Sequence, residues 1–284
     1  MFKNIYAKMC NNKIFDIYNI EPVAEDYFLV DDNIFCIADG VTRDTVEGKA
    51  VPYPKTKEEV VEWKNMYPNP SGAYESAKIC GDNFVKYAKE MKKINEEEIL
   101  KVVKKVNSDI LEINKDRKID YLAEDLYGCV AVGGYITENE LYCFSIGDSH
   151  IIALDENLEI KYLTRNNHEP FETYLDQIYV KKNKFDWYEG KDRVMVRRDF
   201  RNKPHTLYKG KDISFGVLTG EKEAEYYIET YKWNLEKIKY ICAYSDGCEP
   251  FFNTKENIQK IIENPSIVEK EGKERTLIIY ERKE

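Results

Sequence analysis

The first part of the chain alternates short apolar runs with polar turns. Residues 4–20 predict a strand, an Asn-Asn turn and a second strand. Residues 27–30 and 34–38 are rich in β-prone side chains, and the polar residues 31–33 between them have the composition of a turn. The pattern therefore predicts a further hairpin, with a three-residue turn centred on Asp32.

Two amphipathic helices are predicted after a polar connection. Residues 45–70 are rich in Pro, Lys and Glu without a clear period, which indicates a surface connection. Ser71 is a suitable N-cap, and apolar residues then recur at steps of three and four. Asn95 caps a second helix with three Glu in its first turn and an apolar stripe over residues 99–113. We expect both helices to pack against a sheet.

The second half of the chain returns to strand patterns. Four β-prone runs between residues 129 and 163 predict a meander of antiparallel strands. Residues 165–212 are polar, with several aromatics and a basic cluster, and show no clear period. A strand ending at Asp246, a helix over residues 249–263 and a closing strand follow. This order of elements indicates an α+β fold in a single domain over residues 1–284.

Composition and charge exclude several classes of protein. The 284 residues are 43% hydrophobic and 33% charged, which is typical of a soluble globular chain. The net charge of −9 argues against a nucleic-acid partner. Apolar runs are too short for a membrane span, and the N-terminus lacks a signal peptide, so we expect a cytoplasmic protein. The seven cysteines are scattered without a Cys-x-x-Cys pair and are interpreted as reduced core residues.

Acidic residues gather at the open end of the predicted hairpin. With a turn centred on Asp32, Asp26 faces Ala38 and Glu25 faces Asp39. Directly opposed carboxylates in a sheet have Cβ atoms roughly 5 Å apart and repel each other. Either the side chains splay into water, or a divalent cation that prefers oxygen ligands, Mg²⁺ or Mn²⁺, offsets the repulsion.

Two more aspartates stand where predicted strands end. Asp148 lies in "SIGDSH" and Asp246 in "AYSDG", and the pair Asp39-Gly40 in "IADG" has the same pattern. A neighbouring Gly lets the backbone turn sharply, so one short unit can offer both a carboxylate and a carbonyl oxygen. Together these strand ends predict an oxygen-rich site for two divalent cations.

The order of these motifs resembles a known family. The chain runs through "AED", a hairpin, "ADGVTRD", two helices, "GCVAVGGYI", "SIGDSH", "YLTRNNH", "SFGVLTGE", "YICAYSDG" and "RTLIIYE". This order resembles the metal-dependent serine/threonine protein phosphatases of type 2C, the PPM family, from about residue 6 to residue 281. The resemblance implies a four-layer α-β-β-α sandwich of two antiparallel sheets flanked by helix pairs, with a flap at about residues 165–212.

The resemblance also implies an activity. Family members use two Mn²⁺ or Mg²⁺ ions at one end of the sandwich, and a bridging water attacks phosphorus in line without a covalent enzyme intermediate. The implied activity is that of a hydrolase, a protein phosphatase that dephosphorylates phosphoserine and phosphothreonine in signalling. The implied partner is a phosphorylated protein, and we expect the enzyme itself to be a monomer.

Site residues are carried over position by position. By resemblance, Asp39 bridges the two metal ions, with Glu25 and the Gly40 carbonyl on one ion and Asp246 on the other. Asp26 orients the attacking water.

One further aspartate has a family counterpart. Asp148 matches a family position that can hold a third, weaker metal ion.

One metal ligand of the family is missing. The last metal aspartate of the family lies three residues before a Thr that opens the final strand, and here that position is Lys273. Glu274 or Glu271 can replace it, or the Lys273 ammonium can occupy the metal position or bind phosphate. The alternative is a pseudophosphatase, a binding or regulatory module without turnover.

The family's phosphate-binding arginine is also absent, because its position is Glu21. Arg43, three residues after Gly40, is the preferred replacement, since arginine binds phosphate bidentately. A basic cluster in the flap is a second candidate, with a solvated basic loop as its alternative: Arg197, Arg198 and Arg201. The three histidines lack metal-ligand spacing and are interpreted as surface or turn residues: His150, His168 and His205.

Overall fold

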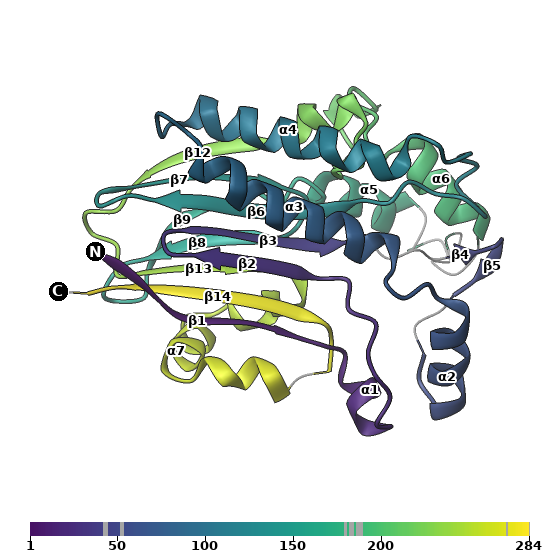
Figure 1. Cartoon of the computed structure of the whole chain (residues 1–284), viewed down its shortest axis with the longest axis horizontal. Coiled ribbons are helices and arrows are strands. Elements are labelled where there is room, and N and C mark those ends of the chain that lie inside the picture. The colour runs from purple at the N-terminus through teal and green to yellow at the C-terminus, as the bar shows by residue number, and fades with distance from the viewer. Residues whose placement is uncertain are drawn as a thin grey trace.

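Two five-stranded antiparallel sheets form the centre of the molecule (Figure 1). The computed structural model describes residues 1–41, 45–51, 54–178, 181, 185, 190–270 and 272–283. The strands of the first sheet are, in spatial order, β1 (Phe2–Cys10), β14 (Arg275–Arg282), β13 (Tyr240–Tyr244), β8 (His150–Leu154) and β9 (Ile160–Leu163). Those of the second are β12 (Glu229–Asn234), β7 (Glu140–Ile146), β6 (Cys129–Ile136), β3 (Ile34–Gly40) and β2 (Tyr27–Asp31).

Strand β3 shows how the layers are held together. Its residues alternate between two faces, as they must in a strand. Phe35 and Ile37 join a buried cluster with Ile151, Ile241 and other residues of the first sheet. The residues between them, such as Cys36, join a second cluster on the helical side of the sheet. Because both faces are covered, the strand is apolar from Ile34 to Ala38, which is why this part of its sequence lacks alternation.

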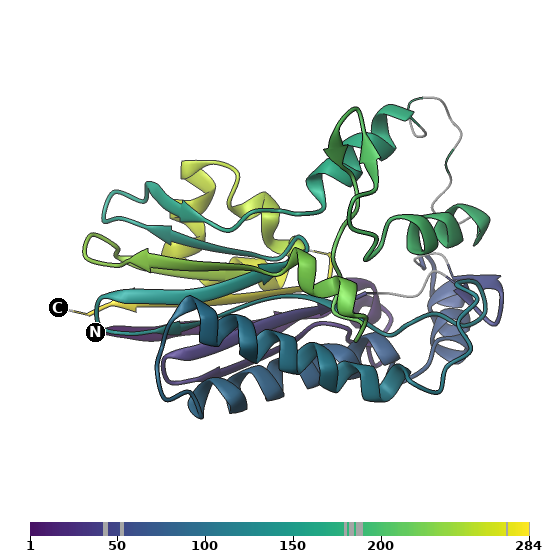
Figure 2. The ribbon, with the colours of Figure 1, turned by 90° about the horizontal axis from the view of Figure 1, so that it is seen from above.

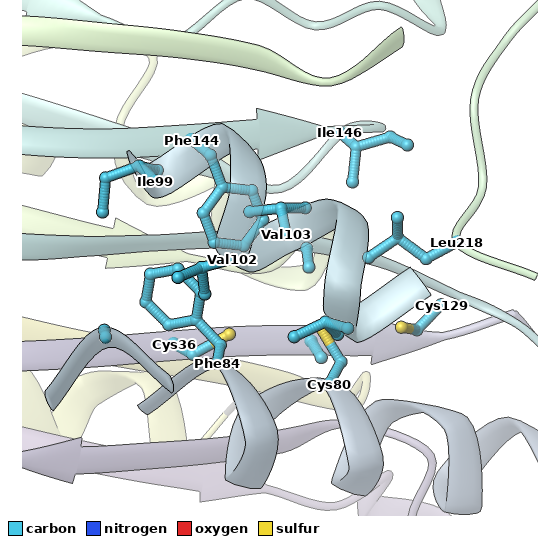
Figure 3. Close-up of a cluster of buried hydrophobic side chains, with 14 of the residues drawn as sticks. Cys36, Cys80, Phe84, Ile99, Val102, Val103, Cys129, Phe144, Ile146 and Leu218 are labelled. Atoms are coloured by element: carbon cyan, nitrogen blue, oxygen red, sulfur yellow. The ribbon is translucent and has the colours of Figure 1, made fainter. Parts of the chain in front are cut away.

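Helices α3 (Gly72–Lys89) and α4 (Glu96–Asn114) cover the outer face of the second sheet (Figure 1). Figure 3 shows Phe84 of α3 and Val103 of α4 in the same cluster as Phe144 of β7. The predicted caps are confirmed. Ser71 Oγ accepts a hydrogen bond from the Tyr74 amide, and Asn95 Oδ1 accepts one from the Glu98 amide.

Helix α7 (Lys255–Glu263) covers the other side of the sandwich, so the predicted four-layer α+β order is confirmed. Among the described residues, its neighbours on this side are the 3₁₀ segments η3 (Asp246–Phe251) and η4 (Pro265–Lys270), in place of a second α-helix. The helix predicted over residues 249–263 therefore begins later. Thr254 caps it, and Pro250 lies in the preceding 3₁₀ turn.

Two predictions for the first 70 residues are wrong. The predicted second strand is helix α1 (Lys13–Ile17), capped by Asn12. The predicted surface connection contains α2 (Lys57–Met66) and the short strands β4 (Thr45–Val46) and β5 (Lys49–Ala50).

Tertiary packing explains both differences. The rings of Phe15 in α1 and Trp63 in α2 lie 5.6 Å apart in one buried cluster. A capping box between Thr56 and Glu59 starts α2. With only Val60 and Trp63 buried in α2, the polar segment gave too few apolar residues to reveal a helical period.

The predicted meander is split between the two sheets. Strands β6 and β7 pair in the second sheet, while β8 and β9 pair in the first. The chain crosses from one sheet to the other at residues 147–149. Period-two patterning predicts strands but does not indicate which sheet each strand joins. The crossing brings Asp148 to the end of the sandwich.

The flap segment, residues 165–212, has a structure of its own. It contains α5 (Glu169–Ile178), α6 (Gly190–Asp199) and the strand pair β10 (Leu207–Tyr208) and β11 (Lys211–Asp212). Figure 2 shows this segment standing beside one end of the sheets. The aromatics that interrupt the sequence pattern, including Phe171 and Phe200, form a buried cluster with Phe215. The 3₁₀ segment η2 (Lys222–Tyr227) follows before β12.

The cysteines agree with the prediction of reduced, mostly buried thiols. Six of the seven cysteines are buried, Cys10 is half-buried, and all seven are free thiols. Within the described ranges, no helix has the length and apolar character that a membrane crossing requires.

Candidate metal centre at the end of the sandwich

The register of the β2–β3 hairpin differs from the prediction by one residue. Tyr27 pairs with Ala38 and Asp31 with Ile34, so the turn has two residues. Asp32 adopts a φ of 53°, a left-handed conformation that Asp tolerates better than most residues. The predicted three-residue turn is therefore wrong.

This register changes which carboxylates oppose each other. The Gly40 amide donates a 3.2 Å hydrogen bond to the Glu25 carbonyl, which continues the pairing. Asp39 is therefore opposite Asp26, and Glu25 is opposite Gly40. Burial raises the pKa of Asp39 well above its usual range, and the charge of Asp26 raises it further. The repulsion predicted between Glu25 and Asp39 is found between Asp26 and Asp39.

Asp26 is held by residues from the first sheet. Only 3% of the residue is exposed, and its Oδ2 accepts hydrogen bonds from Ser245 Oγ at 2.8 Å and Thr276 Oγ1 at 2.7 Å. Burial raises its pKa to about 7, and the charges of Asp246 and Glu25 act in the same direction, against the two hydroxyl bonds. The side chain thus joins the hairpin to the ends of β13 and β14.

Glu25 is bound to the start of α3. Its Oε1 accepts hydrogen bonds from Tyr67 Oη at 2.6 Å and from Ser71 Oγ, the N-cap, at 2.9 Å. Gly40 lies against the same helix end. A Cβ atom at Gly40 would lie 2.7 Å from the Ala73 carbonyl and 2.7 Å from the Glu25 carbonyl. Only glycine allows β3 to approach this closely.

Asp39, Asp148 and Asp246 line one cleft with Gly40. The cleft has a volume of about 450 Å³, and residues of the flap segment complete its lining. After burial and Asp26, the charges of Asp246 and Asp148 raise the pKa of Asp39. Glu25 and Asp26 do not line the cleft. The structure therefore brings together the aspartates of three strand ends, with two buried carboxylates beside them.

Lys273 is exposed and acts on Asp246 through its charge. Burial and the charge of Asp148 raise the pKa of Asp246, and the ammonium of Lys273 opposes them. Both residues line a neighbouring cavity of about 530 Å³. Glu274 points elsewhere, because its Oε1 accepts the backbone N–H groups of Glu25 at 2.7 Å and Asp26 at 2.9 Å. Glu271 lies outside the described residues.

His168 lies in the cleft beside Asp148 and Glu172. Its Nδ1 is 3.4 Å from Asp148 Oδ2, and one ligand atom from each of the three residues lies within 4.8 Å of the others. Burial acts to raise the pKa of Asp148 and to lower that of His168, but the attraction between them reverses both shifts. Sequence reasoning missed His168 and Glu172. Their four-residue spacing was the available signal, but no helix was predicted there.

The interpretation of the histidines as surface or turn residues is wrong for His150, which is buried with Nδ1 3.3 Å from the Thr164 carbonyl. His168 is partly buried and lies in the bend before α5. The interpretation holds for His205, an exposed residue with a φ of 70°.

The three arginines of the flap segment form neither a solvated basic loop nor a single cluster. Asp125 is buried and accepts hydrogen bonds from Arg201 at 2.7 and 3.2 Å, and Arg197 Nε lies 2.6 Å from its Oδ2. Arg198 pairs with Asp199 on the surface. The sequence patterns did not predict that Asp125 pairs with Arg197 and Arg201. Arg43, the preferred phosphate ligand, lies outside the described residues.

Comparisons with known proteins agree with this architecture. The family model described as Protein phosphatase 2C matches residues 70–277. The fold is similar to that of the serine/threonine phosphatase PstP/Ppp from Mycobacterium tuberculosis, with 13% identity, a TM-score of 0.56, and coverage of 100% of this chain and 99% of that chain. The catalytic domain of PstP in complex with two manganese ions is 12% identical, with a TM-score of 0.56 and coverage of 99% of this chain and 97% of that chain.

A third solved structure is the serine/threonine phosphatase Stp1 from Staphylococcus aureus. Its identity is 10%, its TM-score 0.59, and the alignment covers 100% of this chain and 96% of that chain. No curated protein matches the sequence. Because the family model spans well over half of the chain, this protein belongs to the protein phosphatase 2C family.

Proposed function

We propose that this protein is a metal-dependent phosphatase that hydrolyses phosphoserine and phosphothreonine in proteins. One observation carries the proposal: Asp39, Asp148 and Asp246, from separate strand ends, line one cleft with Gly40. Family membership supports the same activity. We further propose that residues 1–284 are one phosphatase domain and that the flap segment forms part of its substrate site.

The donor set fits divalent cations such as Mn²⁺ or Mg²⁺. Its atoms are all oxygens, the ligands that hard cations prefer. The pKa of Asp39 is raised well above its usual range by burial and by three neighbouring aspartates, so a bound cation would relieve a large repulsion. One solved relative contains two manganese ions.

We assign the metal ligands as follows. Asp39 would contact both ions, Glu25 and the Gly40 carbonyl would serve one, and Asp246 the other. Asp148 would hold a third, weaker ion. Two bound cations supply an acidified water and positive charge for the phosphoryl oxygens.

The chain's other groups position the reactants. Asp26, fixed through Oδ2 by two hydroxyls and opposite Asp39, would orient the attacking water. Arg43 would bind the substrate phosphate. Arg197 and Arg201 also line the cleft, and the two guanidiniums share the carboxylate of Asp125. We therefore assign them a part in holding the flap segment, with their charge favouring a phosphate nearby.

The alternative function is a pseudophosphatase that binds phosphoproteins without turnover. Lys273 favours it, because a cation stands where the family has its last metal aspartate. Glu274, whose Oε1 is bound to two backbone amides, is not oriented as a replacement ligand.

Hydrolysis of a chromogenic phosphomonoester tests the proposal. We expect turnover with Mn²⁺, none with EDTA, and a loss of at least a hundredfold in Asp39→Asn. Asp32→Asn, the same change at the exposed turn of the same hairpin, is the matched control and should retain activity. Absence of metal-dependent turnover in the wild type would favour the pseudophosphatase. Turnover that survived in Asp39→Asn would refute the site.

A further inference from the structure

Asp148, His168 and Glu172 form a group distinct in chemistry from the other carboxylates of the cleft. The ligand atoms of the three side chains all lie within 4.8 Å of one another, and one of them is an imidazole nitrogen. The site assigned to Glu25, Asp39, Gly40 and Asp246 offers oxygen only. The inference below rests on the proposed function, because it concerns the same cleft.

Hydrogen bonds fix the segment that carries His168. The Asn167 amide donates to the Gly147 carbonyl at 3.2 Å, and the Gly147 amide donates to Asn167 Oδ1 at 3.1 Å. Asn167 Nδ2 also donates to the Tyr227 carbonyl at 3.1 Å. Because Gly147 directly precedes Asp148, these bonds hold His168 next to Asp148 without relying on attraction between the two side chains.

The orientation of the imidazole is that of a metal ligand. His168 Nε2 lies 3.2 Å from the Gly216 carbonyl, which can only accept, so Nε2 carries a hydrogen. The other nitrogen, Nδ1, is the one directed at Asp148. The Phe215 ring packs edge-on at 4.8 Å and fixes the ring plane. Histidines that bind metals commonly donate their second N–H to a backbone carbonyl in this way.

Glu172 completes the group from the first turns of α5. It lies four residues after His168, and its amide donates to the His168 carbonyl at 3.0 Å, so both residues lie on one side of the helix start. Ligands at about 2.1 Å from one ion are at most about 4.2 Å apart. Because the three ligand atoms lie within 4.8 Å of one another, the group must contract to bind one ion, and the exposed side chain of Glu172 can rotate to achieve this.

We propose that His168 and Glu172 join Asp148 in binding the third ion assigned above to Asp148, and that this ion is a transition-metal dication, with Mn²⁺ preferred over Mg²⁺. A nitrogen ligand favours a transition metal, whereas Mg²⁺ is selected by oxygen-only sites. The ion would join α5 of the flap segment to the crossing between β7 and β8. Occupancy of this site would therefore fix the flap segment against the metal centre.

Pulsed electron paramagnetic resonance of the full chain with Mn²⁺ tests the site, because directly bound ¹⁴N gives a hyperfine coupling that oxygen ligands do not. We expect ¹⁴N coupling in the wild type and its loss in His168→Gln, with one fewer Mn²⁺ bound per chain. His205→Gln is the matched control, since His205 is exposed and packs on the Tyr226 ring at 5.1 Å. Excess Mg²⁺ should not remove the coupling.

Glu172→Gln provides a second variant at an exposed position. We expect Mn²⁺ affinity at this site to fall at least tenfold, with thermal unfolding in EDTA unchanged. Wild-type protein without ¹⁴N coupling at saturating Mn²⁺ would overturn the site, as would coupling that persists in His168→Gln. Asp39→Asn separates the two proposals: it should lose hydrolysis and keep the ¹⁴N coupling. An inactive wild type that shows the coupling would refute only the phosphatase.

Discussion

The buried carboxylate of Asp125 is expected to hold the flap segment to the rest of the protein. Asp125 lies outside the flap segment and is 4% exposed, while Arg197 and Arg201 are 5% and 2% exposed. Their charges hold the pKa of Asp125 below its usual range, although burial acts to raise it. Asp125→Asn preserves the shape of the side chain and removes the negative charge that faces the guanidiniums of Arg197 and Arg201.

The size of the effect follows from the burial of the group. Removing one partner of a buried ion pair costs about 3–5 kcal/mol, because the remaining charge is left uncompensated. The flap segment contributes Phe171 and Phe200 to its own apolar cluster, so its detachment need not disrupt the central sheets. We therefore expect the cost to appear as local opening of α6. At 1.36 kcal/mol for each factor of ten, amide exchange there should accelerate by about two to four orders of magnitude.

Hydrogen–deuterium exchange read by mass spectrometry measures this effect peptide by peptide. Peptides covering α6 should exchange faster in Asp125→Asn, while those covering β3 and β6 should not change. Asp116→Asn, an exposed change ahead of Asp125 in the same connection, is the control and should match the wild type. Equal acceleration in all peptides would mean that Asp125 supports the whole fold. Unchanged exchange in α6 would refute the ion-pair argument.

Two further predictions concern the metal centre. Lys273→Asp should tighten Mn²⁺ binding and raise the rate of hydrolysis, because it replaces a cation beside Asp246 with a carboxylate. Calorimetry measures the binding and initial rates measure the hydrolysis. A lower rate would mean that Lys273 binds the substrate phosphate. In EDTA, the stability of the protein should fall as pH rises from about 4 to about 7, because the pKa of Asp26 is raised to about 7 in the folded state and the unfolded chain releases its proton first. Thermal unfolding should show that the free energy of unfolding falls by up to about 4 kcal/mol over this range. In Asp26→Asn this dependence on pH should be weaker, and a wild type whose stability does not depend on pH would contradict the prediction.

Local sequence patterns predicted the elements whose boundaries depend on adjacent residues. Helices α3 and α4 begin at the expected caps, because capping and apolar period are properties of a few adjacent positions. The hairpin register was wrong by one residue, because a two-residue and a three-residue turn both suit the sequence around Asp32. That single shift decides whether Asp26 or Glu25 faces Asp39.

Local sequence patterns could not predict contacts between segments that are far apart in the sequence. Asp26 accepts hydrogen bonds from Ser245 and Thr276, more than 200 residues away. Asp125 and Arg201 are 76 positions apart, and neither has a neighbour that predicts the pair. Resemblance to a family supplied the metal residues through their order. It had no counterpart for His168 and Glu172, so only the folded chain shows them beside Asp148.

Lys273 differs from the residue that the family has at this position, and the effect of this change depends on the adjacent Glu274. The chain has a lysine in place of the last metal aspartate, and the next residue, Glu274, directs a carboxylate at the backbone of Glu25 and Asp26. Burial and the charges of Asp26 and Glu25 raise the pKa of Glu274 well above its usual range, against the two backbone hydrogen bonds. The pKa values of Asp26, Asp39 and Asp246 are raised as well. Without a bound cation these carboxyl groups relieve the repulsion by keeping protons, whereas a cation would relieve it with the groups ionised; this is the physical reason for proposing metal binding over a decayed site.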